Sequence, residues 1–541
     1  MSVKVAPMSE NKTPFISEGI IPILSNSSAI ELEKTVLLNS EEEWRAMQRV
    51  GQATVRELLK DFKELKPVPE NLSVLLLCGK GKNGGDGLLV CDHLLRELPR
   101  AKVSVVLLSQ RSELNPLTEK ALNEVEERVV LHQYPEGLSE TKLEALLDAE
   151  FGRSQAINLC IDGVLGLGFV PPLKEAVSES IAAMNSCDRI EVRASIDLPS
   201  GVSESDGQPV FAADFTYLAG IPKACVFKGN ARYGRVRFID IGLIDRARDR
   251  GLNFETKLYY ADSVFTDRLL TLRQANLDKR ALGHLFIIGG SRFMPGALMM
   301  SVQAAIQSGI GLVTVFAPSS IVPSLAARAP EAMWVSLPEN GMGTLSPQAA
   351  DIVLSQAGLA TAMLIGPGLG RNQDTEFFVQ KILLEFVQPI VLDADALMPR
   401  VIEMIQKGRN ASEHIVLTPH FGEFLRMTKL AEIRLEVDAL LKIIKNIRAT
   451  VVLKGAITRI SDGKAIYINT RGGPVFSRGG SGDILAGIIG TQLAQKERTP
   501  LVAALLGVLI HGLAGESLAR KSGQIMVRTT QVIDHLPNVL R

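Results

Sequence analysis

One aspartate lies in a turn whose composition suits the transfer of a phosphoryl group. Asp483 directly follows Gly479-Gly480-Ser481-Gly482, and the apolar run 484–493 behind it has the composition of a helix. Backbone amides at a helix N-terminus can converge on a phosphate where no side chains intervene, and the helix dipole favours the anion. A carboxylate beside a bound anion repels it, so its presence there indicates a function, such as accepting a proton from the attacking group. The alternative is a glycine-rich turn in which Asp483 only caps the helix.

Five apolar runs of strand length in the second half each end in small, polar or charged residues. These ends are Gly289–Ser291, Gly366–Gly370, Asp393–Leu397, Thr418-Pro419-His420 with Glu423, and Lys454–Thr458. Ligands of parallel α/β sheets gather at the carboxyl ends of the strands, so we expect these segments to form one working face. Each residue also has an ordinary explanation. His420 could be a surface or core histidine, Lys454 a solvated strand-end lysine, and Asp393 and Asp395 helix caps.

The first half contains a second glycine-rich segment after an apolar run. The run 72–78 leads directly into Gly79–Gly87, and we expect a helix to begin after Gly87. Strand, glycine loop and helix in this order are the context of a phosphate or dinucleotide loop. The alternative is a tight turn between a strand and a helix.

Polar clusters follow three of the expected strands of the first half. They are Asn83 with Asp86, the segment Asp162–Gly168, and the segment Asp197–Gly201. Oxygen ligands drawn from several loops suit a hard cation, and no His/Cys spacing for zinc is present. A single aspartate after a strand is more often a turn former. The hypothesis of a cation site therefore depends on the three clusters lying at the same edge of the sheet.

The elements that must position these residues alternate between strand and helix. Strand candidates at 103–108, 156–161 and 191–196 are separated by segments of helical composition, which predicts a parallel sheet covered by helices on both faces. Residues 41–66 are expected to form an amphipathic helix or helix pair, and residues 1 to about 30 a loosely held lead-in. At 541 residues the chain should hold at least two domains, and the charged stretch 246–251 marks the boundary. We predict one domain over residues 1–250 and a second over 254–541.

Composition excludes several partners. The 59 basic and 59 acidic residues balance, which leaves no electrostatic footprint for nucleic acid or an anionic membrane. We find neither a signal peptide nor an apolar run that approaches the ~20 residues needed to span a bilayer. The five cysteines are odd in number and form no Cys-x-x-Cys pair, so we expect buried reduced thiols and a cytoplasmic protein.

Three motifs of the first half resemble those of the NAD(P)H-hydrate epimerase family (YjeF N-terminal domain). They are Gly84-Gly85-Asp86-Gly87, Asp162–Gly168 and Ile196–Gly201, within about residues 40 to 245, and Lys223 and Gly229 fit a last block more loosely. The resemblance implies a Rossmann-like fold and a potassium ion held by Asn83, Asp162 and Ser200. It implies that the hydrated nicotinamide nucleotide faces Gly84, Gly85, Asp86, Gly87, the segment Gly166–Pro172 with Gly166 and Gly168, and Asp197.

Six motifs of the second half, in order, resemble the ADP-dependent NAD(P)H-hydrate dehydratase family (YjeF C-terminal domain) of the ribokinase-like superfamily. They are Gly289–Ser291 with Gly296-Ala297, Gly366–Gly370, Asp393–Leu397, Thr418-Pro419-His420 with Glu423, Lys454-Gly455 with Thr458, and Gly479–Gly487. The resemblance covers about residues 254 to 541. It implies that the nucleotide is bound by Lys454, Gly455, Ala456, Ile457, Thr458 and Gly482. It implies that Ala297, Gly368 or Gly370, His420 and Asp483 face the hydrated substrate.

Domains of these two families commonly occur fused, so the chain as a whole resembles a bifunctional repair enzyme. The resemblance implies that the R and S hydrates of NADH and NADPH are epimerised, with Asp197 moving the proton. The S hydrate is then dehydrated at the expense of ADP or ATP, with Asp483 as the base. It also implies K⁺ and Mg²⁺ as cofactors and a homo-oligomer without nucleic-acid or membrane partners.

Two departures from the family patterns affect the first half. Lys82 stands where an asparagine is usual, and the helix motif Leu-Met-Glu-x-Ala-Gly appears only as 46–51. In the second half Asp278-Lys279-Arg280 replaces His-Lys-Gly.

Two rival functions stay open at this point. The Gly-x-Gly-Asp turn also occurs in ribokinase-like kinases of sugars or vitamin precursors, which would release a stable phosphorylated product. The segments Thr418–His420 and Gly366–Gly370 count against sugar kinases, so thiazole or pyrimidine kinases are the closer alternative. With Lys82, the first half could be a nucleotide-sensing or interaction module without activity.

Overall fold

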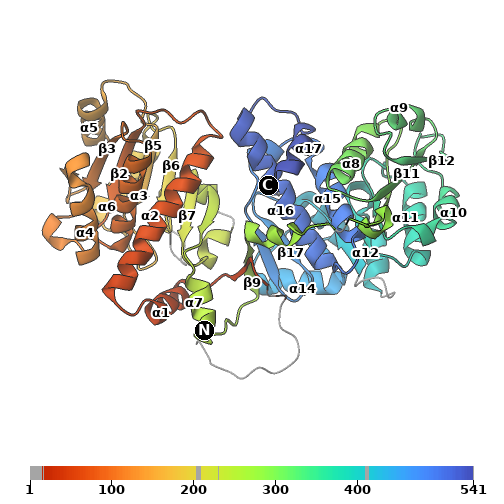
Figure 1. Cartoon of the computed structure of the whole chain (residues 1–541), viewed down its shortest axis with the longest axis horizontal. Coiled ribbons are helices and arrows are strands. Elements are labelled where there is room, and N and C mark those ends of the chain that lie inside the picture. Colours follow the sequence, from red (N-terminus) through yellow and green to blue (C-terminus); the bar gives the residue numbers. More distant parts are fainter. Residues whose placement is uncertain are drawn as a thin grey trace. The chain divides into compact units, whose positions relative to one another are not determined.

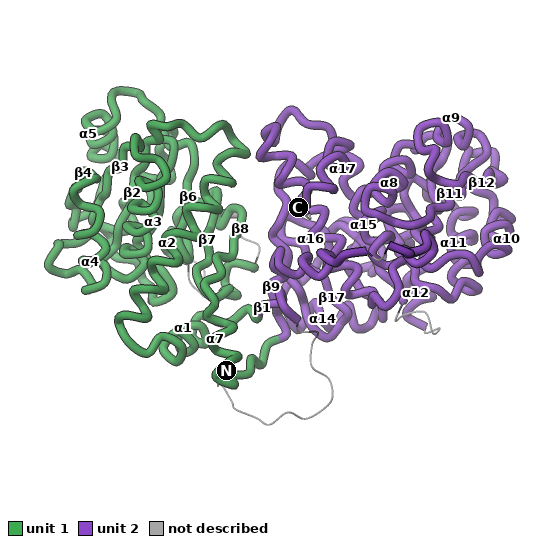
Figure 2. The backbone as a smooth tube through the Cα atoms, in the orientation of Figure 1, with its two compact units in different colours: residues 1–11, 22–256 green, residues 12–21, 257–541 purple. Residues whose placement is uncertain are grey.

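The computed structural model describes residues 15, 17–202, 209–228, 231–273, 275–407 and 414–539 of the chain. They form two compact units (Figure 2). Unit 1 is built on residues 22–256, and unit 2 on residues 257–541 together with the segment that ends at Ile21.

Unit 1 contains a seven-stranded parallel sheet in the order β4-β3-β2-β5-β6-β7-β8 (Figure 1). Its strands are β2 (Ser73–Cys78), β3 (Lys102–Leu107), β4 (Val130–Gln133), β5 (Leu159–Gly163), β6 (Arg193–Ile196), β7 (Phe215–Ala219) and β8 (Arg235–Ile239). Its helices are α1 (Asn26–Val36), α2 (Ser40–Phe62), α3 (Lys82–Glu97), α4 (Pro116–Val125), α5 (Glu140–Phe151), α6 (Glu175–Ser186) and α7 (Leu243–Asp249).

The alternation of side chains along β2 places helices on both faces of this sheet. Leu75 and Leu77 belong to a buried cluster with residues of α5 and α6. Leu76 points the other way, where a Cβ added at Gly87 of α3 would lie 2.8 Å from its Cδ1. Since successive strand residues face opposite sides, both faces are apolar and both are covered. The predicted three-layer α/β architecture is confirmed.

Unit 2 contains an eleven-stranded mixed sheet in the order β1-β9-β18-β17-β16-β15-β14-β13-β10-β11-β12. Only the pairs β16–β17 and β17–β18 are antiparallel among the strand pairs whose direction is described. The strands are β1 (Ile20–Pro22), β9 (Leu258–Ala261), β10 (His284–Ile288), β11 (Leu312–Pro318), β12 (Met333–Leu337), β13 (Ala362–Ile365), β14 (Ile390–Leu392), β15 (Ile415–Leu417), β16 (Thr450–Leu453), β17 (Thr458–Ser461) and β18 (Ile466–Asn469). The helices are α8 (Pro295–Gln307), α9 (Val322–Ala326), α10 (Ala349–Leu354), α11 (Gln373–Glu385), α12 (Pro399–Gln406), α13 (Phe421–Thr428), α14 (Val437–Ile447), α15 (Ser481–Ala494), α16 (Pro500–Ser522) and α17 (Gln531–His535).

Helices α8, α15 and α16 cover one face of the unit 2 sheet. Leu285 and Ile287 of β10 join their buried residues in one core cluster. The intervening residues Phe286 and Ile288 are also fully buried, so the opposite face is covered as well. Helix α16 is long and apolar enough to cross a membrane, at mean hydropathy 1.8, whereas the sequence analysis found no such run. Because 83% of that stretch is buried inside the unit, α16 acts as a core helix.

The segment before unit 1 supplies an edge strand to unit 2. Ile20 is fully buried in the unit 2 core, and the amide of Asp262 donates to the carbonyl of Gly19 at 2.9 Å. Gly19 has φ +78°, and a Cβ there would lie 2.4 Å from the backbone nitrogen of Phe265. The expectation of a loose lead-in was wrong for residues 17–24, because their isoleucines bury well on an existing sheet edge.

Candidate active sites

The glycine-rich segment after β2 is mostly helical. Helix α3 begins at Lys82, so Gly84–Gly87 lies in its first turns, and the prediction of a loop up to Gly87 was wrong. A Cβ added at Gly84 would lie 2.0 Å from the carbonyl oxygen of Gly79. Glycine is therefore needed here for close packing of the helix start on the end of β2.

A cavity of about 740 Å³ opens in unit 1 where its strands end. It lies beside the loops that follow β2, β5, β6 and β7, and α1 and α2 also contribute to its wall. The predicted residues that line it are Asn83, Asp86, Gly166, Gly168 and Asp197. The loops were thus predicted at the correct edge of the sheet.

Asp162 and Ser200, predicted as ion ligands with Asn83, form a fully buried cluster. Asp162 accepts hydrogen bonds from the Ser200 amide at 2.7 Å, the Ser200 hydroxyl at 2.6 Å, the Ser195 hydroxyl at 3.0 Å and the Val164 amide at 3.2 Å. Burial raises the pKa of Asp162, although these hydrogen bonds oppose the rise. The side-chain amide of Asn83 donates to the carbonyl of Leu165 at 2.9 Å, which ties α3 to the same loop.

Asp197 is held in an uncommon conformation by a buried lysine. Its φ is +64°, in the left-handed region that residues other than glycine rarely adopt, and such strain concentrates at functional sites. Lys223 is 1% exposed, pairs with Oδ1 of Asp197, and donates to the carbonyl of Ala219 at 2.7 Å. A Cβ added at Gly166 would lie 3.3 Å from Oδ2 of Asp197, so this oxygen faces the loop after β5.

Two further carboxylates face the cavity. Burial, with Asp197 and Glu33, raises the pKa of Asp86 well above its usual range. Burial also raises the pKa of Glu33, which lies on α1 and which the sequence analysis missed. No sequence signal marked Glu33, which lies between the lead-in expected up to about residue 30 and the helix expected from residue 41. Lys82 pairs with Glu43 of α2 at 2.6 Å, so its charge is partly neutralised.

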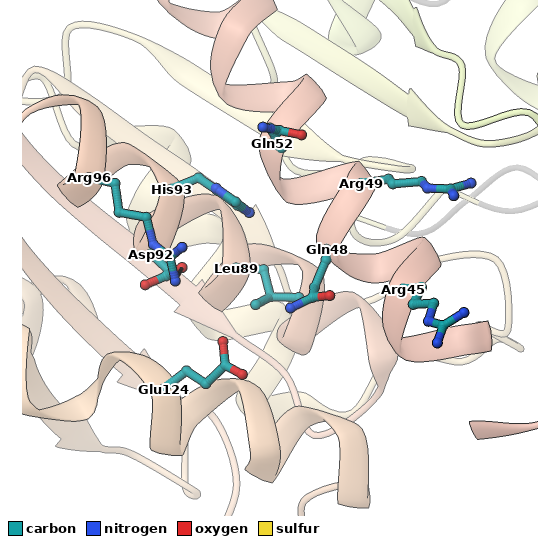
Figure 3. A pocket seen from close by; sticks show the side chains of 9 residues that line it. All are labelled: Arg45, Gln48, Arg49, Gln52, Leu89, Asp92, His93, Arg96 and Glu124. Atoms are coloured by element: carbon teal, nitrogen blue, oxygen red, sulfur yellow. Dashed lines mark ion pairs between the residues drawn. The ribbon is translucent and has the colours of Figure 1, made fainter. Parts of the chain in front are cut away.

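A smaller hollow of about 310 Å³ lies elsewhere in unit 1, between α2, α3 and α4 (Figure 3). Arg96 lies over the buried carboxylate of Asp92 at 2.8 Å, while Arg45 and Arg49 extend away from it. None of the predicted site residues lines this hollow. The larger cavity at the strand ends is therefore the candidate epimerase site.

In unit 2 the ends of β14, β15 and β16 meet at one charged group. The Nζ of Lys454 lies 3.0 Å from Oδ1 of Asp393, which also accepts from the Thr418 hydroxyl at 2.7 Å, and it lies 3.9 Å from Oε2 of Glu423. Burial alone would lower the pKa of Lys454, but Asp393 and Glu423 raise it above its usual value. Asp393 makes no capping hydrogen bond, so its charge serves this cluster.

The turn around Asp483 is adjacent to that cluster. Helix α15 begins at Ser481 after Gly480 at φ +93°, and its first N–H groups have no acceptor within the helix. A Cβ added at Gly482 would lie 3.1 Å from the Nζ of Lys454, and the carbonyl of Asp483 accepts from the Ser301 hydroxyl of α8 at 2.8 Å. Within 4 Å of a Cβ at Gly479 there is no atom, which leaves the mouth of the turn open.

Asp483 has a strongly perturbed carboxyl group. Burial, followed by repulsion from Asp393, raises its pKa to about 7, although Lys454 opposes the rise. A carboxyl group with this pKa at the start of a glycine-rich turn is a candidate general base, since half of it is ionised near neutral pH.

His420 begins α13 as its N-cap. Its Nδ1 accepts from the amides of Gly422 at 3.0 Å and Glu423 at 3.3 Å, while Oε2 of Glu423 accepts from the His420 amide at 2.9 Å. With Nδ1 engaged as an acceptor, the neutral ring carries its proton on Nε2. The side chain is 59% exposed, and Nε2 lies 3.6 Å from Oε1 of Glu423.

The remaining predicted residues of unit 2 line the same strand ends. A Cβ added at Gly368 would lie 3.2 Å from the Cβ of Ala297, and the amide of Gly370 donates to Asp395 at 3.0 Å. Ala456 is exposed beside Lys454 and the hydroxyl of Thr458 donates to the Gly455 carbonyl at 3.1 Å. Gly229 of the predicted unit 1 motif lies outside the described residues.

Comparison with known families agrees with this division. Residues 285–538 match the family model described as NAD(P)H-hydrate dehydratase, and residues 44–225 match the model of the YjeF-related protein N-terminus. The chain is similar to the bifunctional NAD(P)H-hydrate repair enzyme Nnr of Moorella thermoacetica, with 34% identity over 526 residues that cover 92% of each chain. The enzyme of the same description from Coxiella burnetii is 30% identical over 95% of this chain and 98% of its own.

The chain is also similar to solved structures. An ADP/ATP-dependent NAD(P)H-hydrate dehydratase from Bacillus subtilis, co-crystallised with ATP/Mg²⁺, is 26% identical. The match covers 52% of this chain and 96% of that chain, with a TM-score of 0.44.

Proposed function

The chain belongs to the bifunctional NAD(P)H-hydrate repair enzymes, and we propose that Asp483 is the base of its dehydratase and Asp197 a proton carrier of its epimerase. The family repairs hydrated NADH and NADPH by epimerising the two hydrates and by nucleotide-dependent dehydration. The observation that carries the proposal is the position of Asp483, in the first turn of α15 beside Lys454, with a pKa of about 7.

Dehydration needs help because hydroxide is a poor leaving group. Transfer of a phosphoryl group to the ring hydroxyl turns it into phosphate, which the lone pair of the ring nitrogen can then expel. Loss of a proton from the adjacent ring carbon to solvent then restores the carbon–carbon double bond of NAD(P)H. Asp483 takes the hydroxyl proton, and the amides of Gly479–Gly482 with Lys454 offset charge on the transferring group. With ADP as donor the products are NAD(P)H, AMP and phosphate.

With Asp483 as the base, the remaining residues at these strand ends would contact the nucleotide and the hydrated ring. The nucleotide lies along the segment Lys454–Thr458, and the hydrated ring lies between Ala297, the Gly366–Gly370 loop and Nε2 of His420. The described residues hold no cluster of three His, Cys, Asp or Glu side chains able to bind a metal ion. We therefore place Mg²⁺ on the nucleotide phosphates, where it would offset their charge.

A potassium ion fits unit 1. Oδ1 of Asn83 is buried without a hydrogen-bond partner, which suits an oxygen ligand of a hard cation. Asn83 would hold the ion together with Asp162 and Ser200, and the ion would order the loops after β5 and β6. In unit 1, Asp197 exchanges the proton while the hydroxyl leaves and returns on the other face. The five cysteines are all free and buried, as predicted, which suits a cytoplasmic protein. That the chain forms a homo-oligomer stays a prediction.

The test is incubation of the purified chain with hydrated NADH plus ADP or ATP. We expect recovery of the reduced-nicotinamide absorbance and release of phosphate in equal amounts. A phosphorylated product that accumulates without recovery of NADH would instead support a kinase of a vitamin precursor.

A further inference from the structure

Three carboxylate side chains of unit 1 line one cavity, but only one of them forms an ion pair within the described part of the chain. Glu33 of α1, Asp86 of α3 and Asp197 after β6 all line it. Lys223 is buried and pairs with Asp197, whereas no ion pair to Glu33 or Asp86 occurs among the described residues. Lys82, also at the wall, already pairs with Glu43.

An unused hydrogen-bonding atom on α3 shows where a ligand would be held. Oδ1 of Asp86 is buried without a hydrogen-bond partner, and Asp86 lines the cavity from the first turns of the helix. An unpaired buried polar atom is unfavourable, so a bound group that pairs with it is favoured.

The charged neighbours of Asp86 and Asp197 differ, and this difference suits one to act as an acid and the other as a base. Carboxylates that share a site cannot all ionise easily, and a neighbouring cation decides which of them does. Burial, with Asp197 and Glu33, raises the pKa of Asp86 well above its usual range, while Lys223 and Lys82 oppose the rise only in part. Asp197 differs from Asp86 in its surroundings, because the buried side chain of Lys223 pairs with it.

We propose that Asp86 is the general acid of the epimerase half and that it gives its proton to the departing ring hydroxyl. This assignment rests on the proposed epimerase function of unit 1, and it deepens that function by dividing the proton transfers between two carboxyl groups.

The step balances over one turnover. The Asp86 proton moves to the hydroxyl oxygen, the carbon–oxygen bond breaks, and its electron pair leaves with water. The lone pair of the ring nitrogen forms a double bond to the same carbon, and the resulting cation is stabilised by the carboxylates. Water then adds to the opposite face and gives a proton to Asp197, and exchange through cavity water returns a proton to Asp86.

Asp86→Asn in the full chain tests the acid. The substrate is the purified R hydrate of NADH without nucleotide, so that dehydration cannot proceed, and the R-to-S conversion is followed by chromatography. We expect the wild-type rate above the spontaneous background to fall by about 10²-fold or more. Glu97→Gln is the matched control, because Glu97 is exposed at the far end of α3 and outside the cavity wall.

The outcomes separate the two proposals. A wild-type chain that does not accelerate the conversion contradicts the epimerase function itself. An active wild type with Asp86→Asn within about threefold of it overturns the role of Asp86 alone. The thermal unfolding profile of each variant checks that unit 1 is still folded, since dehydration of the S hydrate reports only on unit 2.

Discussion

The Asp483 carboxyl group lies in a turn that is open at Gly479 and is influenced by the charges of Asp393 and Lys454. Its role can therefore be tested by substitution. Asp483→Asn preserves the shape of the turn and its amides, so nucleotide binding should remain. Dehydration of the S hydrate should fall by about 10²–10⁴-fold, because the amide cannot accept the proton. Calorimetric titration with ADP and phosphate release measure the two effects separately.

Loss of folding would not explain such a result. The pKa of Asp483 is about 7 in the folded chain and ~3.9 for an unfolded aspartate, so ionisation costs folding stability as the pH rises between these values. The Asn variant should therefore unfold at a higher temperature than the wild type at pH 8 and at a similar one near pH 4. Near-native turnover in this variant would contradict the assignment of the base.

The same carboxyl group sets a pH dependence. Only ionised Asp483 can act as a base, so kcat/KM for dehydration should fall as the pH drops through about 7. Asp393→Asn removes the neighbouring negative charge that helps to raise this pKa, so the fall should move to lower pH. Phosphate release between pH 5.5 and 9 measures both profiles, and coincident profiles would show that Asp393 does not act on Asp483.

At the scale of elements, the start of α3 depends on glycines for packing. A Cβ at Gly84 meets the Gly79 carbonyl oxygen at 2.0 Å, whereas one at Gly81 meets no atom within 4 Å. We expect Gly84→Ala to displace α3 from the strand end and to reduce epimerisation by at least about tenfold, since a misplaced group costs activity steeply. Gly81→Ala is the control and should retain activity. Equal activity of both variants would contradict this packing role.

The loops after β5 and β6 depend on one buried carboxylate. Asp162 accepts from Val164 of one loop and from Ser200 of the other. Asp162→Ala leaves these donors unpaired, so the chain should still dehydrate the S hydrate but no longer use the R hydrate beyond its spontaneous conversion. Consumption of both epimers at equal rates would refute this role. Chiral analysis of a mixed hydrate sample during turnover measures it.

At the scale of the whole molecule, the two units are not two consecutive stretches of the chain. Ile20 precedes residues 22–256 of unit 1 in the sequence but is fully buried in the core of unit 2. Ile20→Ala should lower the free energy of unfolding of unit 2 by about 2–5 kcal/mol, as for other large-to-small core substitutions.

The two activities report which unit is affected. Dehydration should be lost at a lower temperature in Ile20→Ala, while epimerisation should persist to the wild-type temperature. Leu38→Ala is the control, because Leu38 is 66% exposed. Earlier loss of epimerisation would mean that the segment supports unit 1 instead.

Much of this protein could be predicted without coordinates. Apolar runs that each end in glycine or charged residues predicted two α/β sheets and their working edges, because strand periodicity and turn chemistry are local properties of a chain. The residues Asp197, Asp393, Lys454 and Asp483 were all found this way.

Only the tertiary structure decided which charges meet. Glu33 faces the epimerase cavity, Lys223 pairs with Asp197, and Lys454 pairs with Asp393 across 61 positions of sequence. The helical start at Lys82 and the edge strand at Ile20 were missed for the same reason. Close packing, burial and charge pairing arise between segments that are distant in sequence, so they set pKa values and helix boundaries that no local pattern contains.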